Sequence, residues 1–194
     1  MPEPRDSLSP LSIGQKVRLL EVAREALNAH VRRGVRLQVT DGDTRLKERQ
    51  GIFATLLLGD RVRGCIGVPD PRDSLLKSVI EVVSLAATDD PREAPLRLDE
   101  VGRVDIELSV LGPMRTTRPE DVEVGRHGLF IQRDGAAGVL LPQVAAQAGW
   151  SRTEFLDQVC IRAGLPPDAW RQSGARIEVF TADVFSETSL RRVD

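Results

Sequence analysis

Apolar residues recur along this chain with two periods, one typical of helices and one typical of strands. A spacing of three and four residues predicts an amphipathic helix from Ile13 to the region of Arg33, with Gly34 ending it. Ser12 and Gln15 have the spacing of a capping box at its start. The same period predicts further helices over residues 74–87, 142–148 and 152–163, and a short helical turn over residues 166–170.

Other segments have the composition or the alternation of strands. These are residues 35–39, 52–58, 61–67, 104–110, 129–131, 138–141 and 176–185. The run 52–58 is apolar at odd and even positions, which predicts a strand covered on both faces. Gly59-Asp60 predicts a tight hairpin into the next strand, because glycine tolerates a positive φ and aspartate favours turns.

The motif Arg63-Gly64-Cys65-Ile66-Gly67 lies on that return strand. Regular alternation would place Arg63 and Cys65 on one face, and Val62, Gly64 and Ile66 on the other. Glycine within a strand marks a bulge or a place where a ligand or another backbone comes close. We therefore take Cys65 as a candidate nucleophile, Arg63 as a candidate anion clamp, and Gly64 and Gly67 as candidate substrate-binding positions. The structural alternative is that Cys65 is a small core residue.

Two further polar positions are candidates for chemistry. His127 lies between Gly125 and Gly128, where backbone could approach a ligand, and histidine serves as an acid or base near neutral pH. Glu107 lies on the polar side of strand 104–110, where it could orient either Cys65 or His127. The alternatives are a turn histidine with its hydrogen bonds satisfied, and the solvated side of an antiparallel sheet. Cys160 lies on the apolar face of its helix, and we expect it in the core.

Composition limits the classes of function. The chain has 194 residues, is 41% hydrophobic and 29% charged, and has a net charge of -2. That balance gives no electrostatic reason to expect a nucleic-acid partner. Two cysteines and two histidines do not form a zinc motif, and we identify no metal ligand and no cofactor. Residues 1–6 lack the features of a signal peptide and no apolar run approaches the roughly 20 residues of a membrane span, so we expect a cytoplasmic protein.

The chain resembles the AMMECR domain family through a set of motifs in order. They are residues 51–58, the Arg63–Gly67 motif, Ala86-Ala87, Asp90-Pro91-Arg92, residues 105–111, residues 125–129, the Leu140–Ala145 motif, Trp150, Phe155-Leu156, Cys160, residues 163–165 and Trp170. Gln143, inside the Leu140–Ala145 motif, is taken as a further candidate binding residue. Gln147 departs from the family pattern, in which glutamate is expected, and this weakens any role for an acid at that position.

The resemblance implies an α+β fold, with a mainly antiparallel sheet flanked by helices, a smaller lobe and a cleft between the lobes. It implies one AMMECR-type domain with a core of about residues 13–187, with residues 1–10 and 187–194 as loosely ordered ends. It also implies partners, because bacterial and archaeal members resemble protein A of the AmmeMemoRadiSam set, found with a Memo-type protein and a radical-SAM protein.

Two hypotheses about function follow. In the first, a cleft handles a small molecule or catalyses its reaction, with Cys65 as nucleophile, His127 as its base, Arg63 as anion clamp and Glu107 as an orienting group. In the second, the chain is a non-catalytic scaffold or protein-binding module, and the glycines serve close packing of the backbone.

Overall fold

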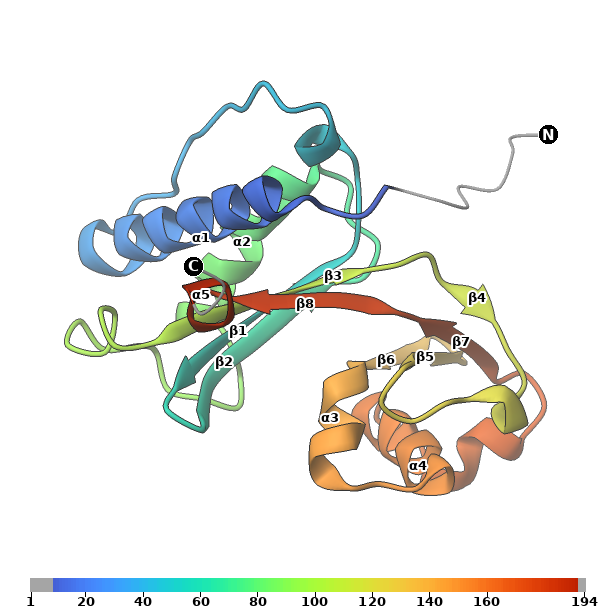
Figure 1. Ribbon diagram of the computed structural model, residues 1–194. Helices are drawn as coiled ribbons and strands as arrows, with labels where there is room; N and C mark the ends of the chain where they lie inside the picture. The colour runs from blue at the N-terminus through green and yellow to red at the C-terminus, as the bar shows by residue number, and fades with distance from the viewer. Residues whose placement is uncertain (1–8, 192–194) are drawn as a thin grey trace. The chain divides into compact units, whose positions relative to one another are not determined.

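The chain divides into two compact units, which are described separately. The computed structural model describes residues 9–191. The first unit comprises residues 9–111 together with residues from 183 onward, and the second comprises residues 112–182. Each unit contains a four-stranded sheet, and every strand pairing described is antiparallel. The expected α+β class, with antiparallel sheets flanked by helices, is confirmed (Figure 1).

The sheet of the first unit has the strand order β2-β1-β3-β8. Its strands are β1 (Ile52–Leu58), β2 (Arg61–Val68), β3 (Asp105–Leu111) and β8 (Ala182–Ser186). Helices α1 (Ile13–Arg33) and α2 (Leu75–Thr88) lie together against one face of this sheet (Figure 1). That face presents Ile52, Ala54 and Leu56 to the helices in a continuous apolar core. β2 is the edge strand, so its outer backbone groups face away from the sheet.

Local signals in the sequence account for the ends of α1. The Ser12 hydroxyl accepts from the backbone N–H of Gln15, while the Gln15 side chain accepts from the N–H of Ser12, as the predicted capping box requires. Gly34 ends the helix with a φ of 63°, a left-handed conformation that glycine adopts without steric cost. At the start of α2, Ser74 is the cap, and its side chain accepts from the backbone N–H of Lys77.

The sheet of the second unit has the order β4-β7-β5-β6. It is built from β4 (Arg115–Thr116), β5 (Gly128–Arg133), β6 (Ala136–Leu140) and β7 (Arg176–Phe180). Helices α3 (Pro142–Ala148) and α4 (Arg152–Arg162) belong to the same unit. Short 3-10 helices occupy residues 119–121 and 167–171, and a third, residues 45–47, lies in the first unit. The second core contains Phe155, Val159 and Cys160 from α4, so the expected core position of Cys160 is confirmed.

Three predicted elements need correction. Residues 35–39 do not form a strand, although Leu37 and Val39 pack against the first core as irregular chain. The predicted strand 176–185 is interrupted at Thr181, where β7 ends and β8 begins in the other sheet. Residues 187–191, expected to be loosely ordered, form helix α5 (Glu187–Arg191). The expectations for residues 1–8 and 192–194 lie outside the described residues.

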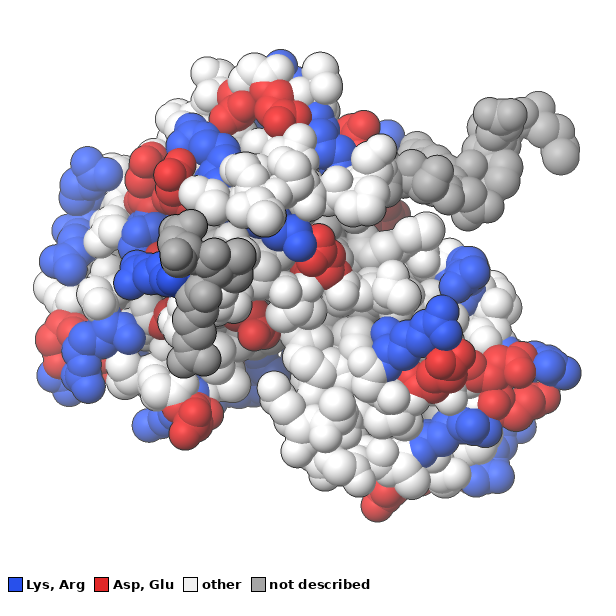
Figure 2. All heavy atoms as spheres, viewed as in Figure 1, with Lys and Arg blue, Asp and Glu red and all other residues white. Residues whose placement is uncertain are grey.

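Charged side chains of both signs are mixed on the face drawn in Figure 2. Figure 2 shows lysine and arginine beside aspartate and glutamate across the visible face. Among the helices within residues 9–191, none combines the length and the apolar character needed to cross a bilayer.

Candidate functional site

The Cys65 motif places its thiol in a row across three strands. Cys65 on β2 pairs with Thr55 on β1, and Thr55 pairs with Glu107 on β3. Directly paired residues in antiparallel strands point to the same face. The row therefore lies on the face opposite the one covered by α1 and α2. Cys65 and Glu107 are both half-buried, and they are two strand spacings apart, roughly 10 Å.

Thr55 is the residue that contacts the sulfur. Its hydroxyl donates to the Cys65 Sγ across 3.3 Å, and the Thr55 side chain is itself buried. Sequence reasoning did not select Thr55, although it is the one polar residue in the apolar run 52–58, which was the available signal.

Asp90 and Arg92 hold the backbone of Cys65 at the open edge of β2. The Cys65 N–H donates to Asp90 Oδ2 at 2.8 Å, and Arg92 Nη2 donates to the Cys65 carbonyl at 2.7 Å. Edge strands expose unpaired backbone groups, and here side chains take the place of a neighbouring strand. The Asp90-Pro91-Arg92 motif thus acts as a clamp on Cys65, a role that sequence reasoning did not assign to Arg92.

The clamp also places a cation against the backbone of Cys65. Hydrogen bonds from Arg92, together with backbone donors, hold the pKa of Asp90 far below its usual range despite burial. The pKa of Arg92 is raised, mainly by its hydrogen bond with Asp90 and also by the Cys65 side chain. Arg92 reaches Cys65 through the backbone carbonyl of that residue, and the Arg92 side chain is 45% exposed.

Arg63 has different partners from those predicted. A bulge interrupts the pairing of β1 with β2, so Leu56 pairs with Gly64 while Leu57 pairs with Val62, and Arg63 is the extra residue. Regular alternation is therefore broken at Arg63, and Val62 lies on the same face as Cys65 rather than on the opposite one.

The Arg63 guanidinium is buried in a network of carboxylates. It donates to both oxygens of Glu100, at 3.0 and 2.9 Å, and to Glu93 at 3.1 Å. Its hydrogen bonds, with that of the Arg97 backbone, lower the pKa of Glu100 to about 2. With these partners Arg63 stabilises the bulge, and we do not carry it forward as an anion clamp.

The two glycines of the motif are required by packing. A β-carbon on Gly64 would lie 1.9 Å from the carbonyl oxygen of Ala86 on α2. One on Gly67 would lie 2.1 Å from the ring of Phe53, its partner on β1. The space that we expected a ligand to use is filled by the protein's own backbone and ring.

His127 lies in the other unit, in the turn before β5. It is buried, and its Nδ1 accepts the backbone N–H of Glu123 at 3.1 Å. Burial lowers its pKa, so the neutral ring carries its proton on Nε2. Nδ1 is thus already occupied, and a ring with this tautomer offers a hydrogen-bond donor rather than a base.

The structure therefore brings together only part of the predicted site. Cys65 and Glu107 share one face of one sheet, while His127 and Gln143 belong to the second unit, with Gln143 in α3. The predicted pairing of Cys65 with His127 joins two units and stays a prediction. Among the residues from 9 to 191, no three histidine, cysteine, aspartate or glutamate side chains gather in a metal-binding arrangement.

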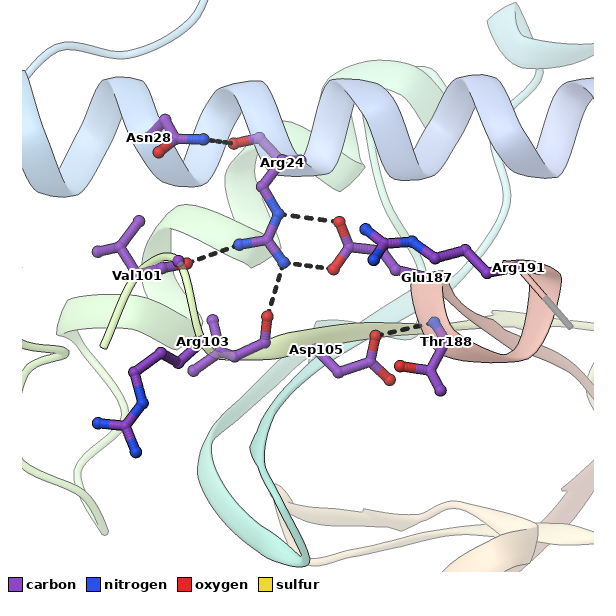
Figure 3. Close-up of a pocket in the computed structure, with 10 residues that line it drawn as sticks. Arg24, Asn28, Val101, Arg103, Asp105, Glu187, Thr188 and Arg191 are labelled. Atoms are coloured by element: carbon purple, nitrogen blue, oxygen red, sulfur yellow. Dashed lines mark hydrogen bonds and ion pairs between the residues drawn. The ribbon is translucent and has the colours of Figure 1, made fainter. Parts of the chain in front are cut away.

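A second candidate is a polar pocket of about 330 Å³ beside α5 (Figure 3). Arg24 of α1 donates to both oxygens of Glu187 and to the carbonyls of Val101 and Val104. Asp105 accepts the backbone N–H of Thr188 at 3.0 Å. These contacts use four of the five N–H groups of the Arg24 guanidinium. They fasten α5 to α1 and β3, so the pocket has a clear structural role.

Known proteins are similar to this chain over most of its length. The AMMECR1 family model matches residues 20–185. A protein of Methanopyrus kandleri is 40% identical over 87% of this chain and 86% of its own length. One of Methanothermobacter thermautotrophicus is 38% identical over 92% of this chain and 97% of its own.

A solved structure is similar as well. The crystal structure of an uncharacterised protein from Pyrococcus horikoshii has a TM-score of 0.85 and 35% sequence identity, over 90% of this chain and 92% of that one. The matched region contains the Cys65 motif, the Asp90–Arg92 clamp and both sheets except for Ser186, the last residue of β8. The chain belongs to the AMMECR1 family.

Proposed function

We propose that the Cys65 face of the β2-β1-β3-β8 sheet handles a small molecule, with the Cys65 sulfur as nucleophile or covalent attachment point. This proposal rests on the groups that surround the Cys65 thiol. Cys65 is partly exposed, its sulfur accepts a hydrogen bond from Thr55, and the Arg92 guanidinium donates to its backbone carbonyl. A hydroxyl donor and a nearby cation both favour the thiolate, which is the reactive form.

The backbone clamp supports the same proposal. Asp90 and Arg92 fix the position of Cys65 at a strand edge, where a free edge would otherwise be mobile. Preorganised placement of a reactive atom is what a binding or catalytic site requires. Glu107, in the same row, is proposed to contact the polar end of a molecule bound across the face.

Alkylation of the folded protein tests this proposal. Iodoacetamide should label Cys65 and spare Cys160, which is fully buried and whose pKa is raised by burial. On a Cys160→Ala background, Cys65 should react several-fold faster than glutathione at the same pH. Thr55→Val and Arg92→Gln should each slow it, while Arg61→Gln, whose side chain is 70% exposed, serves as a matched control.

If Cys65 reacts no faster than glutathione and Cys65→Ala leaves small-molecule binding unchanged in a ligand screen, the nucleophile role is wrong. The second candidate, a non-catalytic scaffold, would then be preferred. One observation favours that alternative, because Gly64 and Gly67 are explained by packing alone. For either function, the family resemblance supports the further proposal that the chain acts with a Memo-type protein and a radical-SAM protein. Co-purification of the full chains tests it.

A further inference from the structure

A groove of about 320 Å³ lies between the edge of β2 and one face of α2. The strand side consists of Ile66, Gly67 and Val68. The helix side consists of Ser78, Glu81, Val82 and Leu85, which are spaced by three and four residues and so share one face. The loop of residues 70–73 lines the end near the start of α2. Every residue of this groove belongs to the first unit.

The edge of β2 is closed at Cys65 and open at Gly67. Because the Cys65 N–H and carbonyl bind Asp90 and Arg92, they point outward from the sheet. Pairing is regular from Cys65 to Gly67, so the two backbone groups of Gly67 point outward as well. Within residues 9–191, no backbone hydrogen bond from outside the strand ladders reaches these two groups. An extended backbone laid against this edge could therefore pair with Gly67.

The walls of the groove are suited to a strand whose side chains point alternately to its two sides. Ile66 and Val68 are half-buried, and Leu85 is 37% exposed, so the floor offers apolar contacts. A strand added to a sheet edge directs alternate side chains to opposite sides, and pockets for those side chains give such recognition its specificity. One apolar side chain of the added strand would contact Leu85.

The charges of the groove favour a cation. Its lining residues include three acidic ones, Asp70, Asp73 and Glu81, and one basic one, Arg72. Asp73 and Glu81 pair with exposed lysine and arginine side chains at 3.9 and 3.6 Å, and such exposed pairs contribute only about 0–1 kcal/mol. The start of α2 is already capped by Ser74. These features disfavour a peptide carboxylate and favour a basic side chain.

We propose that this groove binds an extended basic and apolar peptide segment, which pairs with Gly67 as an added β-strand. The segment places an apolar side chain against Leu85 and a lysine or arginine near Asp70 and Glu81. This recognition uses the strand edge and α2, and it does not depend on the thiol. Cys65→Ser should therefore bind the peptide as tightly as the wild type.

The test uses the full chain and a blocked, fluorescent hexapeptide of alternating lysine and valine, measured by anisotropy at low salt. The counterpart with glutamate in place of lysine should bind at least tenfold more weakly. Leu85→Asp should weaken binding of the lysine peptide at least tenfold. Leu98→Asp is the matched control, since Leu98 is 60% exposed and lies outside the groove, and it should leave binding unchanged.

Backbone pairing has its own readouts. Hydrogen exchange of the Gly67 amide should slow on peptide binding, while that of Cys65, already bonded to Asp90, should not change. Two N-methylated peptides give a second readout. Methyl groups on the peptide amides that point toward Gly67 should abolish binding, while methyl groups on the alternate amides, which point away from β2, should leave binding unchanged.

The proposal is overturned if no binding occurs, if Leu85→Asp and Leu98→Asp have equal effects, or if the Gly67 amide is not protected. Competition by acetyl-lysine amide as effective as that of the hexapeptide would also overturn it, since the groove would then be a site for a simple amine.

Discussion

Asp90 and Arg92 bind the two backbone groups of one residue and also bind each other. Arg92 donates to both oxygens of Asp90, at 2.8 and 2.6 Å, while the Cys65 N–H donates to Asp90 and the Cys65 carbonyl accepts from Arg92. The Asp90 side chain is only 2% exposed. The buried Asp90 carboxylate accepts hydrogen bonds from a guanidinium and from a backbone N–H. It therefore links the chain after α2 to the edge of β2.

The first prediction concerns Asp90→Asn. This change removes the charge that Arg92 pairs with, so the free energy of unfolding near neutral pH should fall by about 2 kcal/mol. The folded pKa of Asp90 lies below its usual value of 3.8, so its contribution is present above that value and is lost as pH falls below it. Urea unfolding of both proteins over a pH series should show the difference shrinking in acid.

Asp99→Asn is the matched control, because Asp99 pairs with Arg97 on the surface and its side chain is 60% exposed. Its effect should stay below about 0.5 kcal/mol. An equal loss for the two variants, or a loss for Asp90→Asn that does not depend on pH, would contradict the role of the clamp.

The second prediction concerns Gly64→Ala. The added β-carbon would lie 1.9 Å from the Ala86 carbonyl oxygen, a backbone atom that cannot move without displacing α2. We expect a loss of about 2 kcal/mol or more in the free energy of unfolding. Gly102→Ala is the control, because a β-carbon there meets nothing within 4 Å. If both variants unfold at the same urea concentration, close packing does not explain the glycine.

Local features of this fold could be predicted from local sequence. The capping box at Ser12 and the left-handed Gly34 depend only on neighbours three to five residues away, so their residue types were sufficient. The hairpin at Gly59-Asp60 was predictable for the same reason. Residues 35–39 show the limit of this approach, since alternation predicts a strand but cannot supply a partner strand.

The candidate site depended on features that residue spacing does not encode. A single extra residue at Arg63 shifts the face of every residue that precedes it on β2, and regular alternation cannot reveal this. The contacts of Cys65 with Asp90 and Arg92 join residues 25 and 27 positions apart. Cys65 and Glu107 could be identified as polar candidates, but the register that makes Thr55 their common neighbour needed the structure.

The third prediction concerns Arg63→Lys. Lysine cannot donate two parallel bonds to Glu100, so the variant should lose about 2 kcal/mol of stability at neutral pH. Arg63 is the main cause, with the Arg97 backbone, of the lowering of the Glu100 pKa from 4.5 to about 2. Its contribution is therefore present above about pH 4.5 and disappears as pH falls towards 2. Thermal unfolding across this pH range measures it.

Arg61→Lys is the matched control on the same strand, because its side chain is 70% exposed and it makes one ion pair with Glu93. Arg63→Lys should leave the alkylation rate of Cys65 within about twofold of the wild type. A large drop in that rate with unchanged stability would return Arg63 to the site as a charge that acts on the thiol.

The fourth prediction concerns the protonation of His127. Since burial lowers its pKa below 6.5, the folded protein resists protonation that the unfolded chain accepts. Stability should therefore decline as pH falls below 6.5, and His127→Gln should remove this part of the dependence. Nitrogen-15 NMR should find the neutral ring protonated on Nε2, because Nδ1 accepts from Glu123. A proton on Nδ1 would contradict the hydrogen bond and restore the predicted role as a base.

The fifth prediction concerns the attachment of α5 by Glu187. Glu187 accepts two hydrogen bonds from Arg24 and one from the backbone N–H of Ile106, so it joins α5 to α1 and β3 (Figure 3). Glu187→Gln keeps the shape of the side chain but removes its charge. Hydrogen exchange of residues 187–191 should accelerate at least tenfold, while exchange in the centre of α1 stays slow.

Glu25→Gln is the matched control for α5, since Glu25 lies on the exposed side of α1 and has no ion pair among the residues that the structure describes. It should leave the exchange of α5 unchanged. If Glu187→Gln also leaves it unchanged, the helix is held by its apolar contact through Leu190 with the first core, and the charged pair adds little. Acceleration in α1 as well as α5 would instead mean that Glu187 stabilises the whole unit.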